Sequence, residues 1–228
     1  MKRSRAGNSI RNTLLILAAI WTGFFIQNLP FFNTYRWGII PRYTESLKGI
    51  ITAPLMHGDW AHLISNSAPM AVLSMMLFYF YRKIAWVSFT LIWVLCGLAV
   101  WLFARGSSVH IGASGVIYGL VAFIFWNGIF RRDLKSIILL LIVTILYSGM
   151  MFGILPHQEG ISWESHLFGG IVGIFIAYFM RRFSIKEEDD IELEEPKSLE
   201  EGDKEYYFDR DVFEKTLREK ERGLRGEE

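Results

Sequence analysis

Long apolar runs separated by short polar connections fill the first 183 residues of this 228-residue chain. Six of the runs approach the roughly 20 residues that an α-helix needs to cross the hydrocarbon core of a bilayer. The pattern therefore predicts an all-α, polytopic membrane protein with six transmembrane helices. The six runs are Thr13–Phe32, Ala61–Tyr81, Ile84–Ala104, Gly112–Phe130, Ser136–Leu155 and Trp163–Met180.

Composition agrees with this pattern and sets the end of the chain apart. Hydrophobic residues make up 52% of the chain, more than a soluble domain of this size would use. Residues 187–228 carry 18 of the 23 acidic residues and 8 of the 24 basic ones, a net charge of −10. We expect a basic cytoplasmic N-terminus (1–12), a membrane domain (13–183) and an acidic, partly disordered cytoplasmic tail (184–228) whose partner is unknown.

The distribution of Lys and Arg predicts how the chain lies in the membrane. The connections on one side hold 12 basic residues and those on the other side hold 4. Because the richer side faces the cytoplasm, both termini are expected there, in a bacterial inner or plasma membrane. The first run contains no cleavage site of small residues, so we expect it to be retained as a span. The second, fourth and sixth runs then enter the membrane from outside.

Polar side chains gather where these three runs begin. The second run opens with His62 and Asn66, the fourth with Ser114 and the sixth with His166. At about 1.5 Å per residue, all of them lie at similar shallow depths below the outer surface. Polar groups inside a membrane are costly and mark function by default, so their matched depth indicates one shared site.

A serine and a histidine at one depth favour nucleophilic catalysis. The hydroxyl of Ser114 needs a base to take its proton, and the neutral imidazole of His166 is suited to this near neutral pH. No acidic residue lies deep in a run, and Asp59 and Glu164 are expected to be hydrated near the helix ends. The sequence therefore predicts a dyad in which Tyr118, one turn after Ser114, packs on the imidazole.

Two glycine stripes indicate how the fourth and sixth runs meet. Gly115 and Gly119 form one GxxxG pattern, and Gly169 and Gly173 form another below His166. Small residues let transmembrane helices approach closely, where lipid supplies no hydrophobic drive for association. We expect the two stripes to pack against each other and to bring Ser114 to His166.

The second run supplies candidate hydrogen-bond donors. His62 and Asn66 share one helix face, and both can donate to a developing oxyanion, together with the backbone N–H of Ser114. Asn66 has an alternative role as a structural group that bonds a neighbouring carbonyl. His57, just ahead of the second run, is suited to hydrogen bonding that shapes the mouth of the predicted site. His110 is a rival base for Ser114, but it precedes Gly112 in a loop, and we expect it not to be held rigidly to Ser114.

Taken together, these residues resemble the motifs of rhomboid intramembrane serine proteases. The matching patterns are His57…His62-x-x-x-Asn66, Gly112-x-Ser114-Gly115-x-x-Tyr118 and His166-x-x-Gly169-x-x-x-Gly173. The resemblance covers residues 10–183 and implies a six-helix bundle with a water-filled cavity that opens outward. It also implies hydrolysis of peptide bonds in or near transmembrane segments of other proteins. The first outer connection departs from the family, since it is short and carries Arg36-Trp37 in place of Trp-Arg.

Two other classes of function stay open at this point. His57, His62 and His166 are enough in number to hold zinc, which would make the protein an intramembrane metalloenzyme. A rhomboid-like fold that only binds membrane segments is the non-enzymatic alternative, although such a protein is expected to lack the serine or the histidine. The favoured interpretation requires no cofactor and no metal, and its partners are transmembrane protein substrates and the lipid bilayer rather than nucleic acid.

Overall fold

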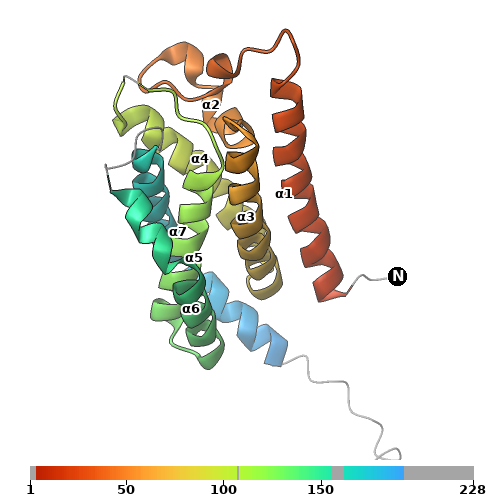
Figure 1. Cartoon of the computed structure of the whole chain (residues 1–228). Helices are drawn as coiled ribbons and strands as arrows, with labels where there is room; N and C mark the ends of the chain where they lie inside the picture. Colours follow the sequence, from red (N-terminus) through yellow and green to blue (C-terminus); the bar gives the residue numbers. More distant parts are fainter. Residues whose placement is uncertain (1–3, 107, 156–161, 193–228) are drawn as a thin grey trace, which may run out of the picture. The chain divides into compact units, whose positions relative to one another are not determined.

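The computed structural model of the protein describes residues 4–106, 108–155 and 162–192 (Figure 1). The chain forms two compact units, residues 1–188 and 189–228, and the site lies within the first. His157 and most of the predicted tail, residues 193–228, lie outside the described residues. In chain order, with 3-10 helices labelled η, the helices are α1 (Arg5–Gln27), η1 (Thr34–Trp37), η2 (Thr44–Ser46), α2 (Gly49–Thr52), η3 (Ala53–Leu55), α3 (Trp60–Phe80), α4 (Ala85–Phe103), α5 (Ser114–Arg131), α6 (Leu134–Tyr147), η4 (Ser148–Ile154) and α7 (Trp163–Glu192).

The predicted all-α class is confirmed for the described residues. Their β pairing is limited to one isolated antiparallel bridge, between Ile39 and His110. Five helices in this part of the chain are long and apolar enough to cross a membrane: α1, α3, α4, α5 and α7 from Trp163 to Phe183. The fifth predicted run, Ser136–Leu155, instead divides into α6, with only 14 residues, and the 3-10 helix η4.

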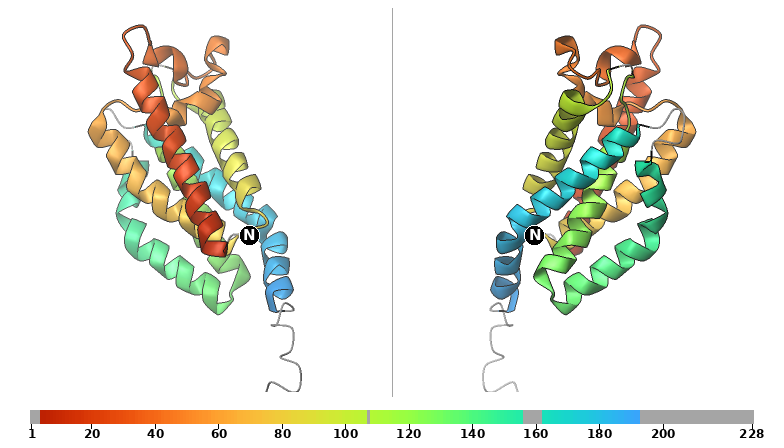
Figure 2. Two further views of the ribbon diagram at one scale, coloured as in Figure 1. Left: turned by 90° about the vertical axis from the view of Figure 1, so that its right-hand side faces the viewer. Right: turned by 90° about the vertical axis from the view of Figure 1, so that its left-hand side faces the viewer.

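The helix α5 lies at the centre of the first unit. It packs against α3, α4 and α6, while α1 packs on the far side of α3, as the two views of Figure 2 show. Residues 115–120 of α5 are buried without interruption. A helix that is buried all round belongs to the core of a bundle, so the chain places the Ser114 motif on its most enclosed element.

The first outer connection, between α1 and α3, is not the short linker that the sequence suggested. It contains η1, η2, α2 and η3, and it is tied to the end of α4. The Arg42 guanidinium donates to the carbonyls of Leu102 and Ala104 at 3.2 and 2.7 Å. Trp37 stacks on Phe32 with ring centroids 5.4 Å apart. The connection folds because its polar groups satisfy the carbonyls left open at the end of α4.

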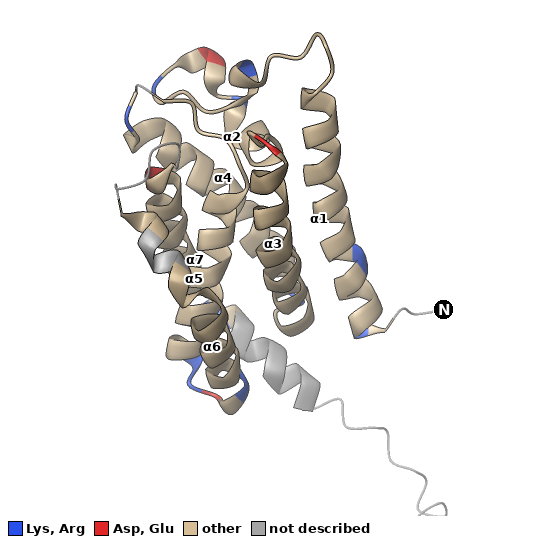
Figure 3. Ribbon diagram, viewed as in Figure 1, with Lys and Arg blue, Asp and Glu red and all other residues tan. Residues whose placement is uncertain are grey.

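Lys and Arg lie at both ends of the first unit. Figure 3 shows them where α1 begins and where α5 turns into α6, and at the other end in the connection between α1 and α3. The turn carries Arg131, Arg132 and Lys135. Asp133 accepts an ion pair from Arg131 at 3.0 Å and caps α6 through the Ser136 N–H at 2.8 Å. The turn between α5 and α6 lies at the end of the unit opposite the starts of α5 and α7, which carry Ser114 and His166.

Candidate active site

Ser114 is the first residue of α5, directly after a sharp bend in the chain. Gly112 has φ +104°, a backbone conformation that favours glycine. Its N–H donates to the Ala53 carbonyl of η3 at 2.9 Å, which anchors the bend to the first outer connection. The first N–H groups of a helix have no partner within it, so the serine stands beside backbone donors.

Ser114 and His166 are in direct contact. The Ser114 hydroxyl oxygen lies 2.8 Å from His166 Nε2. On the other side of the ring, Nδ1 lies 2.8 Å from the Gly153 carbonyl oxygen of η4. A carbonyl can only accept, so the proton of the neutral ring sits on Nδ1 and the lone pair of Nε2 faces the serine. This is the protonation pattern that a general base requires.

The imidazole of His166 is also held by packing. The Tyr118 ring stacks on it with centroids 4.1 Å apart and an interplanar angle of 11°. This geometry agrees with the packing expected from the position of Tyr118 one turn after Ser114. Tyr118 and the Gly153 carbonyl together hold the ring in one orientation without a carboxylate.

The glycine stripes bring α5 and α7 together as expected. A Cβ added to Gly169 would meet the Gly115 backbone, and one added to Gly173 would meet the Gly119 carbonyl and, at 2.9 Å, Ala122. Neither position has room for a side chain. The two helices approach this closely because both contact surfaces consist of backbone.

His62 and Asn66 lie over the bend that precedes Ser114. A Cβ at Gly112 would come within 2.7 Å of His62 Nε2 and 3.7 Å of Asn66 Nδ2. The Gly58 N–H donates to His62 Nδ1 at 3.5 Å, so the ring carries its proton on Nε2, the nitrogen that faces Gly112. Both side chains thus present a donor to the same small space.

The Asn66 amide is buried, and its donor atom is unused. Its Nδ2 has no hydrogen-bond partner among the residues that the structure describes. An asparagine that only satisfies a neighbouring carbonyl would donate to it through this atom. The geometry therefore favours the role of a donor that is held ready over the structural alternative.

His57 lies behind His62 at the base of α3 and is buried, with 1% of its surface exposed. The rings meet edge to face, with centroids 5.0 Å apart. The Gln27 side chain at the end of α1 bonds both the N–H and the carbonyl of His57, the former at 3.0 Å. Burial, with a smaller effect of His62, lowers the pKa of His57 from 6.5 to about 4, so its ring is neutral at neutral pH.

One prediction about a neighbouring residue was wrong. Glu164 is buried rather than hydrated, because Arg105 pairs with its carboxylate. His110 lies in a loop as predicted; its backbone pairs with Ile39, and its side chain bonds Ser162 rather than Ser114. Burial lowers the pKa of His110, and the Glu164 carboxylate opposes this. Asp59 is exposed as expected, and it caps α3 by accepting the His62 N–H at 2.7 Å.

The arrangement combines a serine hydroxyl, a histidine in the tautomer that can accept its proton, and two side-chain donors. Such a set can transfer the acyl group of an amide or ester to Ser114. Within the described ranges, no three His, Cys, Asp or Glu side chains form a group that could hold a metal ion. His57, His62 and His166 lie near one another in the fold but do not converge on one point.

The chain belongs to the rhomboid family. The family model described as Rhomboid domain matches residues 44–183, which is more than half of the chain. With several apolar helices long enough to cross a bilayer, the chain is a multi-pass membrane protein. The matched range includes every site residue that the sequence analysis named.

Relatives from bacteria and a plant share this similarity. An uncharacterised protein of Mycobacterium tuberculosis is 38% identical over 152 residues, which cover 63% of each chain. Rhomboid-like protein 11, chloroplastic, of Arabidopsis thaliana is 25% identical over 80% of this chain and 69% of its own length. YdcA of Bacillus subtilis, named provisionally as a rhomboid protease, is 27% identical over 72% of this chain and 84% of its own. The chain thus matches less than two thirds of the length of the mycobacterial relative.

Proposed function

We propose that the protein is an intramembrane serine endopeptidase that cleaves peptide bonds in or near transmembrane segments of other membrane proteins. The observation that carries the proposal is the 2.8 Å contact between Ser114 Oγ and a His166 nitrogen left free to accept a proton. Membership of the rhomboid family supports the same reaction. The substrates are transmembrane proteins that reach the site from the surrounding lipid bilayer.

Acylation begins when His166 Nε2 takes the hydroxyl proton and Ser114 Oγ attacks the carbonyl carbon of the scissile bond. The negative charge that forms on the carbonyl oxygen is stabilised by His62 Nε2–H, Asn66 Nδ2–H and the Ser114 backbone N–H. These donors act at low dielectric, where each is worth more than in water. His166 then gives its proton to the leaving amine, and a water molecule, activated by the same nitrogen, hydrolyses the acyl-enzyme.

Six spans and cytoplasmic termini complete the proposed arrangement. We treat α6 and η4 together as the remaining span, because they continue without interruption from Leu134 to Ile154. The 12-to-4 asymmetry of basic residues supports this orientation, in which the site opens to the outside of a bacterial plasma membrane.

Cysteines placed at Glu45 and Lys135 should label from opposite faces of sealed cells. Labelling of both from one face would refute the orientation.

The direct test compares the full-length wild type and Ser114→Ala on a transmembrane reporter in liposomes. Wild type should release two defined fragments, and Ser114→Ala should release none. Ser9→Ala is the matched control, since it removes a buried hydroxyl that bonds Arg5 at 3.1 Å at the opposite end of the unit. Undiminished cleavage by Ser114→Ala would overturn the proposal. Loss of wild-type activity with a chelator, restored by zinc, would favour the metalloenzyme instead.

A further inference from the structure

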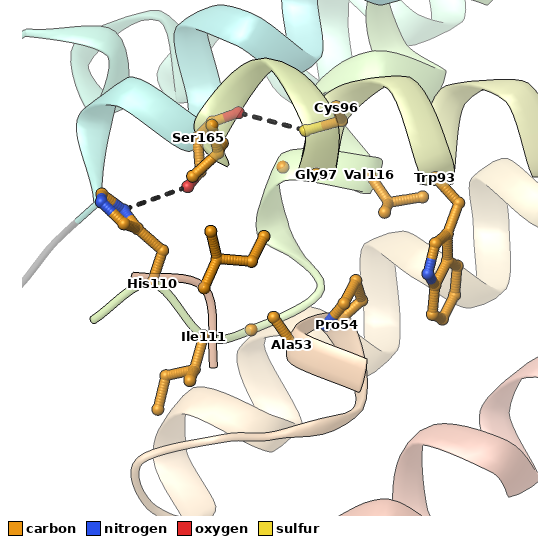
Figure 4. A pocket seen from close by; sticks show the side chains of 13 residues that line it. Ala53, Pro54, Trp93, Cys96, Gly97, His110, Ile111, Val116 and Ser165 are labelled. Carbon is orange, nitrogen blue, oxygen red and sulfur yellow. Dashed lines mark hydrogen bonds between the residues drawn. The ribbon is translucent and has the colours of Figure 1, made fainter. Parts of the chain in front are cut away.

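A buried polar cluster next to the site takes no part in the proposed chemistry. It is centred on His110, of which 2% is exposed. His110 Nδ1 is hydrogen-bonded to Ser162 Oγ and lies 3.5 Å from Ser165 Oγ. Nε2 lies 3.5 Å from Ser108 Oγ. Figure 4 shows His110 and Ser165 facing each other.

The His110–Ser162 contact joins the same two segments of the chain as the Ser114–His166 contact. His110 lies four residues before Ser114, and Ser162 lies four residues before His166. The Ser162 carbonyl accepts the His166 N–H at 3.4 Å, so Ser162, directly before α7, is joined to the first turn of that helix. The contacts His110–Ser162 and Ser114–His166 therefore bridge the same two chain segments at two neighbouring levels.

The backbone around His110 is anchored independently of its side chain. His110 and Ile39 exchange two backbone hydrogen bonds, each 2.9 Å long. Two residues later, Gly112 is bonded to Ala53. His110 is thus fixed to the first outer connection, and its imidazole extends this anchor to the first turn of α7.

Several polar contacts hold the first turn of α7, among them the Arg105–Glu164 ion pair and the His110–Ser162 hydrogen bond. A pocket lies on the α4 side of the bend, lined by Cys96, Gly112, Gly115, His110 and Ser165 among others (Figure 4). The glycine contact between α5 and α7 sets how close the helices come, but a smooth backbone surface resists axial sliding only weakly. Hydrogen bonds are directional, so they can set the remaining degree of freedom.

We infer that His110 is a positioning residue that sets the register of α7 against the segment leading to Ser114. By holding Ser162 and Ser165, it keeps His166 Nε2 in line with Ser114 Oγ. This inference rests on the proposed function. A displacement of reacting groups by about 1 Å can cost about 100-fold in rate, so the loss of this tie should appear in the chemical step.

The experiment measures the reactivity of Ser114 without a peptide substrate. A fluorophosphonate probe forms a bond between Ser114 Oγ and phosphorus, fluoride leaves, and His166 takes the hydroxyl proton. The rate constant of labelling is measured on the full-length protein, beside its melting temperature and the kcat and KM for a transmembrane reporter. His110→Ala should slow labelling and lower kcat by about 10- to 100-fold, with KM unchanged.

Three further variants separate positioning from general stability. His110→Asn retains a hydrogen-bonding group near the place of Nδ1 and should recover most of the rate. The double variant Ser162→Ala/Ser165→Ala keeps the ring but removes its partners, so it should reproduce His110→Ala. Arg42→Ala breaks another tie of the first outer connection, to Ala104 at 2.7 Å, and should lower the melting temperature without slowing labelling of the folded protein.

The outcomes distinguish the inference from the proposed function. Normal labelling of folded His110→Ala, or of the double serine variant if His110→Ala does not fold, would overturn the inference alone. Wild type that labels at Ser114 but cleaves no reporter would overturn the endopeptidase proposal and leave the positioning role intact. Absence of wild-type labelling would overturn both.

Discussion

The site has two sides, one formed by α5 and α7 and the other by α3 with His57. They differ in whether their buried polar atoms have hydrogen-bond partners. On the α5–α7 side, both ring nitrogens of His166 have partners, Ser114 and Gly153. On the α3 side, Asn66 Nδ2 and both ring nitrogens of His57 have no hydrogen-bond partner among the described residues. The His166 ring is fully bonded in the resting protein, whereas the α3 side keeps buried polar atoms without partners.

The difference indicates what each side is for. A buried donor without a partner costs about 1–3 kcal/mol, so a fold retains one where it gains a partner at another stage. The α5–α7 side needs its bonds at rest, because they fix the tautomer and orientation of the base. In the proposed reaction, Asn66 on the α3 side gains its bond only when the oxyanion forms. The following predictions perturb one side or the other, and one of them removes a segment outside both.

The largest effect on activity is expected from removing His166, on the α5–α7 side. His166→Ala should lower kcat by about 10⁶-fold, because Ser114 then has no base, and the double variant Ser114→Ala/His166→Ala should be no worse than either single one. Cleavage of the transmembrane reporter measures all three. Losses that add up in the double variant would show that the two residues do not work as a unit.

Gly153→Ala tests the Gly153 carbonyl, which holds His166 Nδ1 where other serine hydrolases use a carboxylate. Its Cβ would collide with the Tyr118 hydroxyl and lie 3.2 Å from His166 Nδ1, so the carbonyl or the ring must move. We expect kcat to fall by about 100-fold with little change in KM. Gly149→Ala, in the same 3-10 helix, is the matched control, since its Cβ would meet nothing within 4 Å. Equal kcat for the two variants would contradict the role of Gly153.

The unused donors on the α3 side predict a dependence of stability on pH. The pKa of His57 is lowered to about 4 in the folded protein, against 6.5 for an exposed histidine. The unfolded chain therefore binds more protons between these values, and stability is lost as pH falls from 6.5 towards 4, by about 3 kcal/mol at most. The melting temperature of wild type should drop across this range, and that of His57→Gln should drop less. Parallel curves would exclude His57 as the cause.

The smallest effect is expected from the acidic tail. A stop codon after Glu192 keeps α7 whole and removes the segment that carries most of the negative charge. Turnover of a generic reporter and the melting temperature should be unchanged, because both sides of the site lie within residues 1–188. A truncated protein that stays in the membrane but is inactive would place the tail in the catalytic unit.

Features with a residue-type signature could be predicted from the sequence. Apolar runs indicated the membrane helices, and the paired glycines indicated where α5 and α7 meet. The stacking of Tyr118 on His166 followed from helical spacing. These features depend on local periodicity and on side chains of distinctive chemistry, which a single sequence displays.

Features that depend on distant backbone could not be predicted. The Gly153 carbonyl carries no signature, since every residue has one, and it reaches His166 through a 3-10 helix that the apolar run concealed. Glu164 was expected to be hydrated because its partner Arg105 lies 59 residues away in sequence. The firm placement of His110 likewise depends on a bridge to Ile39.

The central claim is that the α3 side contributes only in the transition state, and Asn66→Ala tests it most directly. We predict that kcat falls by about 10²–10³-fold while KM and the melting temperature stay near their wild-type values. Asn127→Ala is the matched control, since its Nδ2 already donates to the Phe123 carbonyl at 2.9 Å within α5. That variant should lose stability and keep its turnover per folded molecule. An Asn66→Ala protein with a lowered melting temperature and normal kcat would contradict the account.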